Sequence, residues 1–154
     1  AIECVLDSGL PLRVCLCAED SALAATLERR GIDVAVCQTS PLGMGATLAE
    51  AARGLGDWSA VLVALADMPL IQPATIAGIA AAATPGQIVV PSFRGQQGHP
   101  VAFGNHFFDL LTQCKGDRGA RWVIEHNPQA VHELAIDDAG ILRDVDTPDA
   151  LRGM

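Results

Sequence analysis

The feature that most constrains the fold is an apolar run that ends abruptly in an acid. Residues 60–66, AVLVALA, carry no polar side chain, and Asp67 follows at once, with Pro69 close behind. A strand that is apolar on both faces is typical of the centre of a parallel sheet that helices cover on both sides. The run therefore predicts a buried central strand with a carboxylate held at its carboxyl end, where ligands of α/β sheets bind.

Strand-like and helix-like segments alternate along the first half of the chain. The opening AIECVLDSG reads as the end of a helix that Gly9 stops. Residues 12–17 and 33–37 are predicted to be strands. The segment between them and residues 46–54 carry apolar side chains at helical spacing. This alternation indicates a doubly wound α/β fold.

The second half of the chain predicts a hairpin and further helices. Pro73 suits the first turn of a helix over ATIAGIAAAA. Strands are predicted for IVVPSF, HPVAF, AVHELAI and ILRDV, with turns at RGQQG and DDAG. Helices are predicted from about Asn105 to Cys114, from about Asp117 to Glu125 and from Thr147 onward. We expect these elements to form one α/β domain over residues 1–154 with a mixed sheet.

Charge and composition exclude several classes of function. The formal net charge of -8 argues against a protein that holds nucleic acid by its phosphates. Aromatic residues make up 4% of the chain, with no tyrosine, which argues against a surface that stacks single-stranded bases. No apolar run approaches the roughly 20 residues that span a bilayer. The five cysteines show no CxxC spacing, and Glu3 and Asp7 stand where a signal peptide would be basic, so we expect reduced thiols and a cytoplasmic protein.

Asp67 has a second acidic group as a possible partner near the end of the chain. A carboxylate at a strand end beside a rigid Met-Pro suits a hard cation such as Mg²⁺ that bridges phosphates, although capping of the next helix is the alternative. In DVDTPDAL, Asp144 and Asp146 alternate, so on a strand they would face the same side. Asp149 falls in a first helical turn, where the helix dipole accounts for it. The pattern predicts a Mg²⁺ site that Asp67 shares with Asp146.

Three further patterns are candidates for contacts with a ligand. SPLGMGATL places Gly43 and Gly45 before a helix N-terminus, where backbone N–H groups can approach an anion; a plain loop-to-helix junction is the alternative. His99 lies between a turn glycine and a proline at a strand start, and a structural role is its alternative. Arg118 and Arg121 lie three apart at a helix start, and they suit either a phosphate or carboxylate clamp or a solvated surface.

Five motifs occur in an order and spacing that resemble the MobA-like nucleotidyltransferases. They are LADMP, SPLGMGATL, GHPVAF, GDRGAR and DVDTPDAL, and they extend over nearly the whole chain. Within that superfamily the chain is most similar to the molybdenum cofactor cytidylyltransferases. The resemblance implies a Rossmann-like three-layer α/β fold with a mostly parallel mixed sheet. It also implies a Mg²⁺-dependent transfer of CMP from CTP to the molybdopterin cofactor, with release of pyrophosphate.

The resemblance also implies roles for individual residues. Asp67 would be a catalytic Mg²⁺ ligand, and its partner would be Asp146, with Asp144 as the alternative. The loop that carries Gly43, Met44 and Gly45 would lie against the nucleotide. The pterin side would be lined by His99, Pro100, Arg118 and Arg121. A molybdoenzyme or its chaperone would be a protein partner.

One part of the family's pattern has no counterpart in the sequence. The family opens with a strand and a glycine-rich loop, followed by a lysine, that hold the triphosphate, whereas Lys115 is the only lysine in this chain. We therefore expect a strand–loop–helix unit of about 30 residues to precede Ala1. The alternatives are a non-catalytic module that binds a nucleotide or the molybdenum cofactor, a guanylyltransferase that uses GTP, and a sugar-phosphate nucleotidyltransferase.

Overall fold

A computed structural model describes residues 1–145, in which the chain forms two compact units. Unit 1 comprises residues 1–10, 59–104 and the chain from residue 130 onward, and unit 2 comprises residues 11–58 and 105–129. The helix predicted from Thr147 onward lies outside the described residues.

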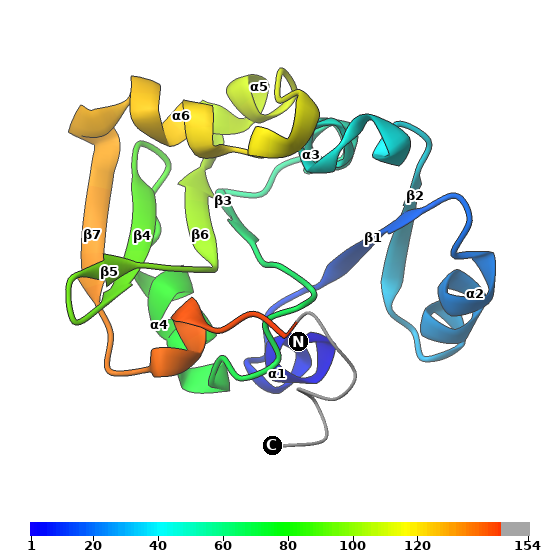
Figure 1. Cartoon of the computed structure of the whole chain (residues 1–154), viewed down its shortest axis with the longest axis horizontal. Coiled ribbons are helices and arrows are strands. Elements are labelled where there is room, and N and C mark those ends of the chain that lie inside the picture. The colour runs from blue at the N-terminus through cyan, green and yellow to red at the C-terminus, as the bar shows by residue number, and fades with distance from the viewer. Residues whose placement is uncertain (146–154) are drawn as a thin grey trace. The chain divides into compact units, whose positions relative to one another are not determined.

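Helices and strands alternate through most of the chain (Figure 1). The α-helices are α1 (Ile2–Asp7), α2 (Ser21–Arg29), α3 (Met44–Ala52), α4 (Pro73–Ala82), α5 (Phe108–Leu111) and α6 (Arg121–His126). The strands are β1 (Arg13–Cys17), β2 (Asp33–Cys37), β3 (Ala60–Val63), β4 (Ile88–Phe93), β5 (Gln96–Gln97), β6 (Val101–Gly104) and β7 (Val131–Ala135). Short 3-10 helices are η1 (Ser40–Leu42), η2 (Asn105–Phe107), η3 (Gly116–Arg118), η4 (Pro128–Ala130) and η5 (Ala139–Leu142).

Unit 1 is built on a five-stranded mixed sheet. Its order is β3-β6-β4-β5, and β7 also pairs with β4. Strand β6 is antiparallel to both β3 and β4, and β7 is parallel to β4. It follows that β3, β4 and β7 run in one direction and that β6 and the short β5 run against them. Unit 2 holds a separate parallel pair, β1 and β2. The predicted α/β fold with a mixed, mostly parallel sheet is confirmed.

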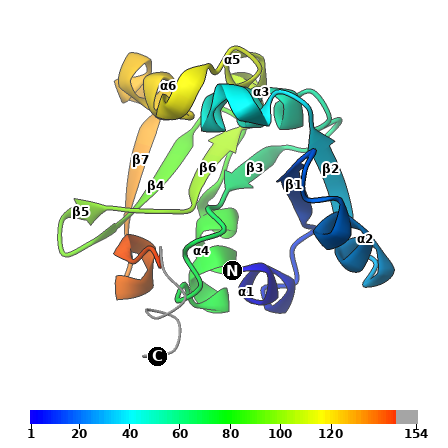
Figure 2. The same ribbon diagram turned by 45° about the vertical axis from the view of Figure 1, so that its right-hand side comes forward.

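The core of unit 1 lies between α4 and one face of its sheet. Ile79 of α4 packs with Val89 of β4 and Ala102 of β6, and all three side chains are fully buried. Figures 1 and 2 both show α4 alongside these strands. Burying an aliphatic side chain of this size is worth roughly 1.5–3 kcal/mol, so this contact fixes α4 on the sheet.

The apolar run at residues 60–66 takes a different place from the one predicted. Only Ala60–Val63 form a strand, β3, which lies at an edge of the described sheet, and its four residues are only partly buried. The buried inner strands are β4, whose first five residues are all buried, and β6, whose four residues are all buried. An apolar sequence shows that a strand is suited to burial, but its neighbours are set by the crossovers between strands, which the sequence pattern leaves open.

One further local prediction is wrong, and two helix predictions are confirmed in part. The predicted strand ILRDV is instead the 3-10 helix η5 followed by irregular chain to Val145, because the side chain of Asp138 accepts a hydrogen bond from Gly140 N and turns the backbone. The helices predicted at 105–114 and 117–125 are present only as the short α5 and α6, each preceded by a 3-10 turn. Within residues 1–145, no helix is both long and apolar enough to cross a membrane.

Candidate active site

In unit 1, residues 136–145 cross the carboxyl ends of the strands; we call them the crossing segment. At its start, Ile136 N donates to Ser92 O of β4 at 2.8 Å. At its end, Val145 N donates to Asp67 O at 2.7 Å. Figure 1 shows this segment leading back from η5 to the chain that follows β3. Two motifs that lie far apart in the sequence, LADMP and the start of DVDTP, therefore meet at one end of the sheet.

Asp138 ties the crossing segment to the start of α4. Its side chain is buried, with 5% exposure. One carboxylate oxygen accepts from Gln72 N at 2.9 Å and from Thr75 Oγ1 at 2.7 Å, and the other accepts from Gly140 N at 2.8 Å. No local pattern indicates this role, because Asp138 has the pattern of an ordinary polar residue in a DDAG turn and two of its partners are more than 60 residues away.

The carboxylates of Asp67 and Asp144 are both exposed at this end of unit 1. The backbone bond between Val145 and Asp67 makes their two segments neighbours. Asp146 lies outside the described residues. The expectation that Asp144 and Asp146 share one face of a strand is wrong for the described part, because residues 143–145 are not in a strand.

The donor chemistry of this pair fits a hard divalent cation. Among residues 1–145, no three His, Cys, Asp or Glu side chains are grouped to hold a metal ion. Mg²⁺ does not need such a cage, because it commonly takes one or two carboxylates and completes its shell with water and substrate phosphates. Asp67 and Asp144 are the described residues that could hold it.

His99 lies in the same unit as Asp67 and contacts the crossing segment. Its backbone N–H donates to Ile141 O of the crossing segment at 3.0 Å. Its ring nitrogen Nδ1 is buried and has no hydrogen-bond partner in the described structure. Burial lowers the pKa of His99, and the Asp67 carboxylate opposes this shift, so burial favours the neutral ring. A buried, unpartnered ring nitrogen fits a polar contact with a ligand.

Pro100 differs from His99 in that it belongs to the core. The side chain is fully buried, and the peptide bond between His99 and Pro100 is cis. Of the two residues predicted from GHPV, His99 therefore keeps a free polar atom, whereas Pro100 takes part in the core.

In unit 2, the glycine loop packs against the GDRGAR motif. A Cβ atom on Gly45 would lie 2.7 Å from Lys115 O and 2.8 Å from Gly116 O. On Gly43, whose φ is 107°, it would overlap the Asp117 carboxylate. The close approach of two backbones thus explains both glycines without a ligand. Between them, Met44 begins α3 and is 49% exposed.

The loop before these glycines is held by Glu50 of α3. Its carboxylate accepts from Gln38 N at 3.1 Å, from Thr39 N at 2.9 Å and from Thr39 Oγ1 at 2.7 Å. The Thr39 hydroxyl is the largest cause that lowers the pKa of Glu50. The end of β2 is therefore fixed to α3, which sets the path of the chain into SPLGMG.

Arg118 and Arg121 converge on one carboxylate of unit 2. Arg118 Nη2 lies 2.7 Å from one oxygen of Glu125, and Arg121 Nε lies 3.1 Å from the other. The arginine side chains are 66% and 76% exposed. Exposed ion pairs of this kind are weak, so both guanidinium groups can exchange Glu125 for another anion. Their role as a clamp stays a prediction.

Comparison with known proteins assigns the chain to a family. The model of the MobA-like NTP transferase domain matches residues 1–132. The chain belongs to this family. The Purine catabolism protein PucB of Bacillus subtilis is 30% identical over 117 residues, which cover 74% of this chain and 57% of PucB. The chain thus spans a little over half the length of that curated relative.

Solved structures support the same assignment. Rv0371c of Mycobacterium tuberculosis is 30% identical, with a TM-score of 0.77 over 99% of this chain and 81% of that one. Its complex with manganese matches at 28% identity with a TM-score of 0.75, covering 99% and 83% of the two chains. A nucleotidyl transferase from Methanothermobacter, at 19% identity, shares the fold with a TM-score of 0.80 over 99% and 75%. The Rossmann-like nucleotidyltransferase fold is confirmed.

Proposed function

We propose that the protein transfers CMP from CTP to the molybdopterin form of the molybdenum cofactor in a Mg²⁺-dependent reaction that releases pyrophosphate. Membership of the MobA-like family supports nucleotidyl transfer in general. The manganese complex of Rv0371c supports the use of a divalent cation in this family. CTP, Mg²⁺ and the pterin acceptor come from the motif resemblance and are the part to be tested. A cytoplasmic setting is favoured by the five free cysteines.

The observation that carries the proposal is the hydrogen bond from Val145 N to Asp67 O. It joins the two acidic motifs at the carboxyl end of β3, where α/β enzymes bind their ligands. Both carboxylates face solvent there, and His99 adds a buried ring nitrogen without a partner. Nucleotidyl transfer needs the charge of the triphosphate to be neutralised at a fixed place, and a cation held by these carboxylates would supply that.

The bonds that change in this reaction are those of one in-line displacement. An oxygen of the acceptor's terminal phosphate attacks the α-phosphorus of CTP, and the bond from that phosphorus to the bridging oxygen of the β-phosphate breaks. Asp67, with either Asp146 or Asp144, would hold the divalent cation, which would neutralise charge on the phosphate oxygens. His99, whose buried ring nitrogen Nδ1 has no partner in the described structure, would orient a substrate group through a hydrogen bond.

Replacing one carboxylate tests the proposal. We expect Asp67→Asn to lower the release of pyrophosphate from CTP and the molybdopterin cofactor by roughly 100-fold or more, because a neutral amide is a poor Mg²⁺ ligand. Asp7→Asn makes the same change of charge at an exposed position of unit 1 and should leave the rate unchanged. Circular dichroism of both variants should match the parent protein.

Calorimetric titration with CTP and with GTP in the presence of Mg²⁺ tests the choice of nucleotide. Tighter binding of CTP supports the proposal, and tighter binding of GTP would make the protein a guanylyltransferase. Equal turnover in Asp67→Asn and Asp7→Asn would remove Asp67 from the metal site. Nucleotide binding with no transfer to the pterin would favour the non-catalytic module.

A further inference from the structure

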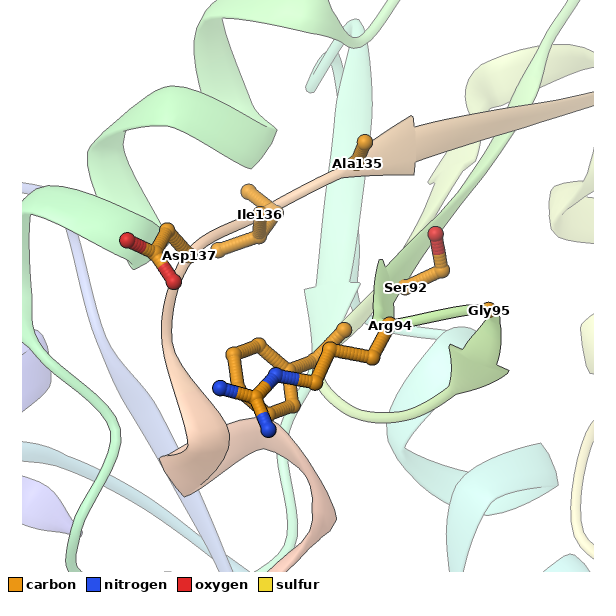
Figure 3. A pocket seen from close by; sticks show the side chains of 7 residues that line it. Ser92, Arg94, Gly95, Ala135, Ile136 and Asp137 are labelled. Carbon is orange, nitrogen blue, oxygen red and sulfur yellow. The ribbon is translucent and has the colours of Figure 1, made fainter.

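A pocket of about 390 Å³ opens in unit 1 where the parallel strands β4 and β7 end. Ser92 and Phe93 line it from β4, and Ile136 and Asp137 line it from the crossing segment (Figure 3). The same segment ends beside Asp67, and the strands point the same way as β3. The pocket therefore lies at the end of the sheet that carries the acidic motifs, but none of the family motifs in the sequence includes it.

Arg94 lines the same pocket, and its backbone is unusual. It is the first residue of the two-residue turn between β4 and β5, with φ of 51°, and Gly95 follows with φ of 81°. Among residues 1–145, no other non-glycine residue has a positive φ. Turns with positive φ at both positions favour Asn-Gly or Gly-Gly, so an arginine here is disfavoured by local sterics. A strained residue at a pocket points to a role for its side chain.

The guanidinium group of Arg94 is oriented but unpaired. Its Cζ lies 5.0 Å from the centroid of the Phe93 ring, over the ring face. Within residues 1–145, Arg94 makes no ion pair or hydrogen bond, so its N–H donors are available. Figure 3 shows the side chain turned back from the turn toward the segment with Ile136 and Asp137. The stack on Phe93 limits the rotation of the guanidinium plane, which favours bidentate binding of an oxyanion.

Unit 1 has few cationic side chains, and Arg94 is one of them. The chain carries a net charge of -8, and its one lysine, Lys115, lies in unit 2. In the described part of unit 1, the arginines are Arg94 and Arg143. The acceptor of a nucleotidyl transfer must bring anionic oxygens into a region that already holds Asp67 and Asp144. A fixed cation nearby offsets that repulsion.

We propose that the pocket at Arg94 binds an anionic oxygen group, phosphate or carboxylate, of the acceptor, and that Asp137 accepts an N–H or O–H of the same molecule. The inference rests on the proposed function, because it assigns the ligand as the acceptor of that reaction. Arg94 is a specificity-determining residue in this arrangement. It holds the acceptor and takes no part in bond breaking.

The test is an NMR titration of the full chain that needs no turnover. Phenyl phosphate and benzoate are added separately while the ¹⁵N signals of the arginine side chains and of the Ser92 and Asp137 amides are followed. We expect a saturable shift of the Arg94 signal. The probe that binds more tightly shows whether the site prefers phosphate or carboxylate. Arg94→Asn should weaken that binding at least tenfold and keep the fold, because asparagine tolerates the positive φ. Arg143→Asn is the matched control and should leave the binding unchanged.

Several results would overturn the site. They are shifts that do not saturate, equal shifts at Arg94 and Arg143, and unchanged probe binding in Arg94→Asn. The proposed site and the proposed function can be rejected independently, because binding of CTP and Mg²⁺ is measured on the same samples. CTP binding that is intact with no response at Arg94 overturns the site, whereas a response at Arg94 without any nucleotide binding overturns its role as an acceptor site. In steady-state assays, Arg94→Asn should raise KM for the acceptor and leave KM for CTP unchanged.

Discussion

Units 1 and 2 each bring a distant segment against the start of a helix, and they do so by opposite means. In unit 1, the buried carboxylate of Asp138 collects three donors and ties the crossing segment to α4. In unit 2, the start of α3 meets residues 115–117 because Gly43 and Gly45 have no side chain. One contact depends on a charged group being present, and the other depends on a Cβ atom being absent.

The difference predicts how each contact fails. A carboxylate that satisfies buried donors is directional, and its loss leaves those donors unpaired at a cost of about 1–3 kcal/mol each. A close backbone approach depends on volume, and a single added carbon must move one of the two segments. Neither contact touches the reacting groups, yet each positions residues that are candidates for substrate binding.

The largest effect is expected for Asp138→Ala. The N–H of Gln72, the hydroxyl of Thr75 and the N–H of Gly140 would lose their acceptor, so we expect a loss of about 3–5 kcal/mol in the free energy of unfolding. Urea denaturation followed by circular dichroism measures it. The neighbouring Asp137→Ala removes an exposed carboxylate and should change stability by less than about 0.5 kcal/mol.

Equal stability of these two variants would show that water replaces the carboxylate. In that case the contrast between the units would be wrong, because the contact of unit 1 would depend on its packing alone.

An intermediate effect is expected for Gly45→Ala. The new Cβ would lie 2.7 Å from Lys115 O, and both sides of the contact are backbone, so we expect a loss of about 1–3 kcal/mol. Gly78→Ala is the matched control, because Gly78 is in the interior of α4 with open space around its Cβ position. There, alanine should stabilise the protein by about 0.5–1 kcal/mol. Thermal unfolding of the two variants gives the comparison.

Opposite signs for the two glycine variants would confirm that the glycine loop is required by close approach. A stabilising Gly45→Ala, by contrast, would show that residues 115–117 move aside freely, and it would return the glycines to a role in ligand binding.

The smallest effect on stability is expected for Glu125→Gln. It removes the shared partner of Arg118 and Arg121, but these ion pairs are exposed, so we expect a change below about 1 kcal/mol. The variant also frees both arginines, and a clamp role predicts tighter binding of an anionic substrate in titration calorimetry. Unchanged binding in Glu125→Gln would assign the two arginines to the surface of unit 2.

Much of the architecture was predictable from local pattern. The strands at 12–17, 33–37 and 88–93 and the helix that starts at Pro73 follow from apolar periodicity and from proline at a first helical turn. The edge position of β3 was not predictable, because pairing depends on which crossover the chain takes. The 3-10 helix at Ala139–Leu142 was also missed, since Asp138 finds its partners through tertiary contacts.

Some residues of the candidate site were likewise predictable from the sequence, and others were not. Asp67 and His99 could be chosen from the sequence, because an acid after an apolar strand and a histidine beside a turn are local features. Asp144 was also chosen, but from a strand that the structure does not contain. Arg94 could not be chosen from the sequence, since an Arg-Gly pair between two strands predicts only a turn. A signal was present in retrospect, because a two-residue turn with two positive φ angles favours Asn or Gly where this chain has arginine.

The sequence by itself determined the α/β class, the family motifs and the acid after an apolar strand, because these depend on periodicity and on residues close together in the chain. Three contacts were decided only by the tertiary structure. Val145 bonds to Asp67, Gly45 packs against Lys115, and Arg94 lines a pocket. Such contacts join residues tens of positions apart. Their formation depends on how the whole core packs, and no local pattern encodes that.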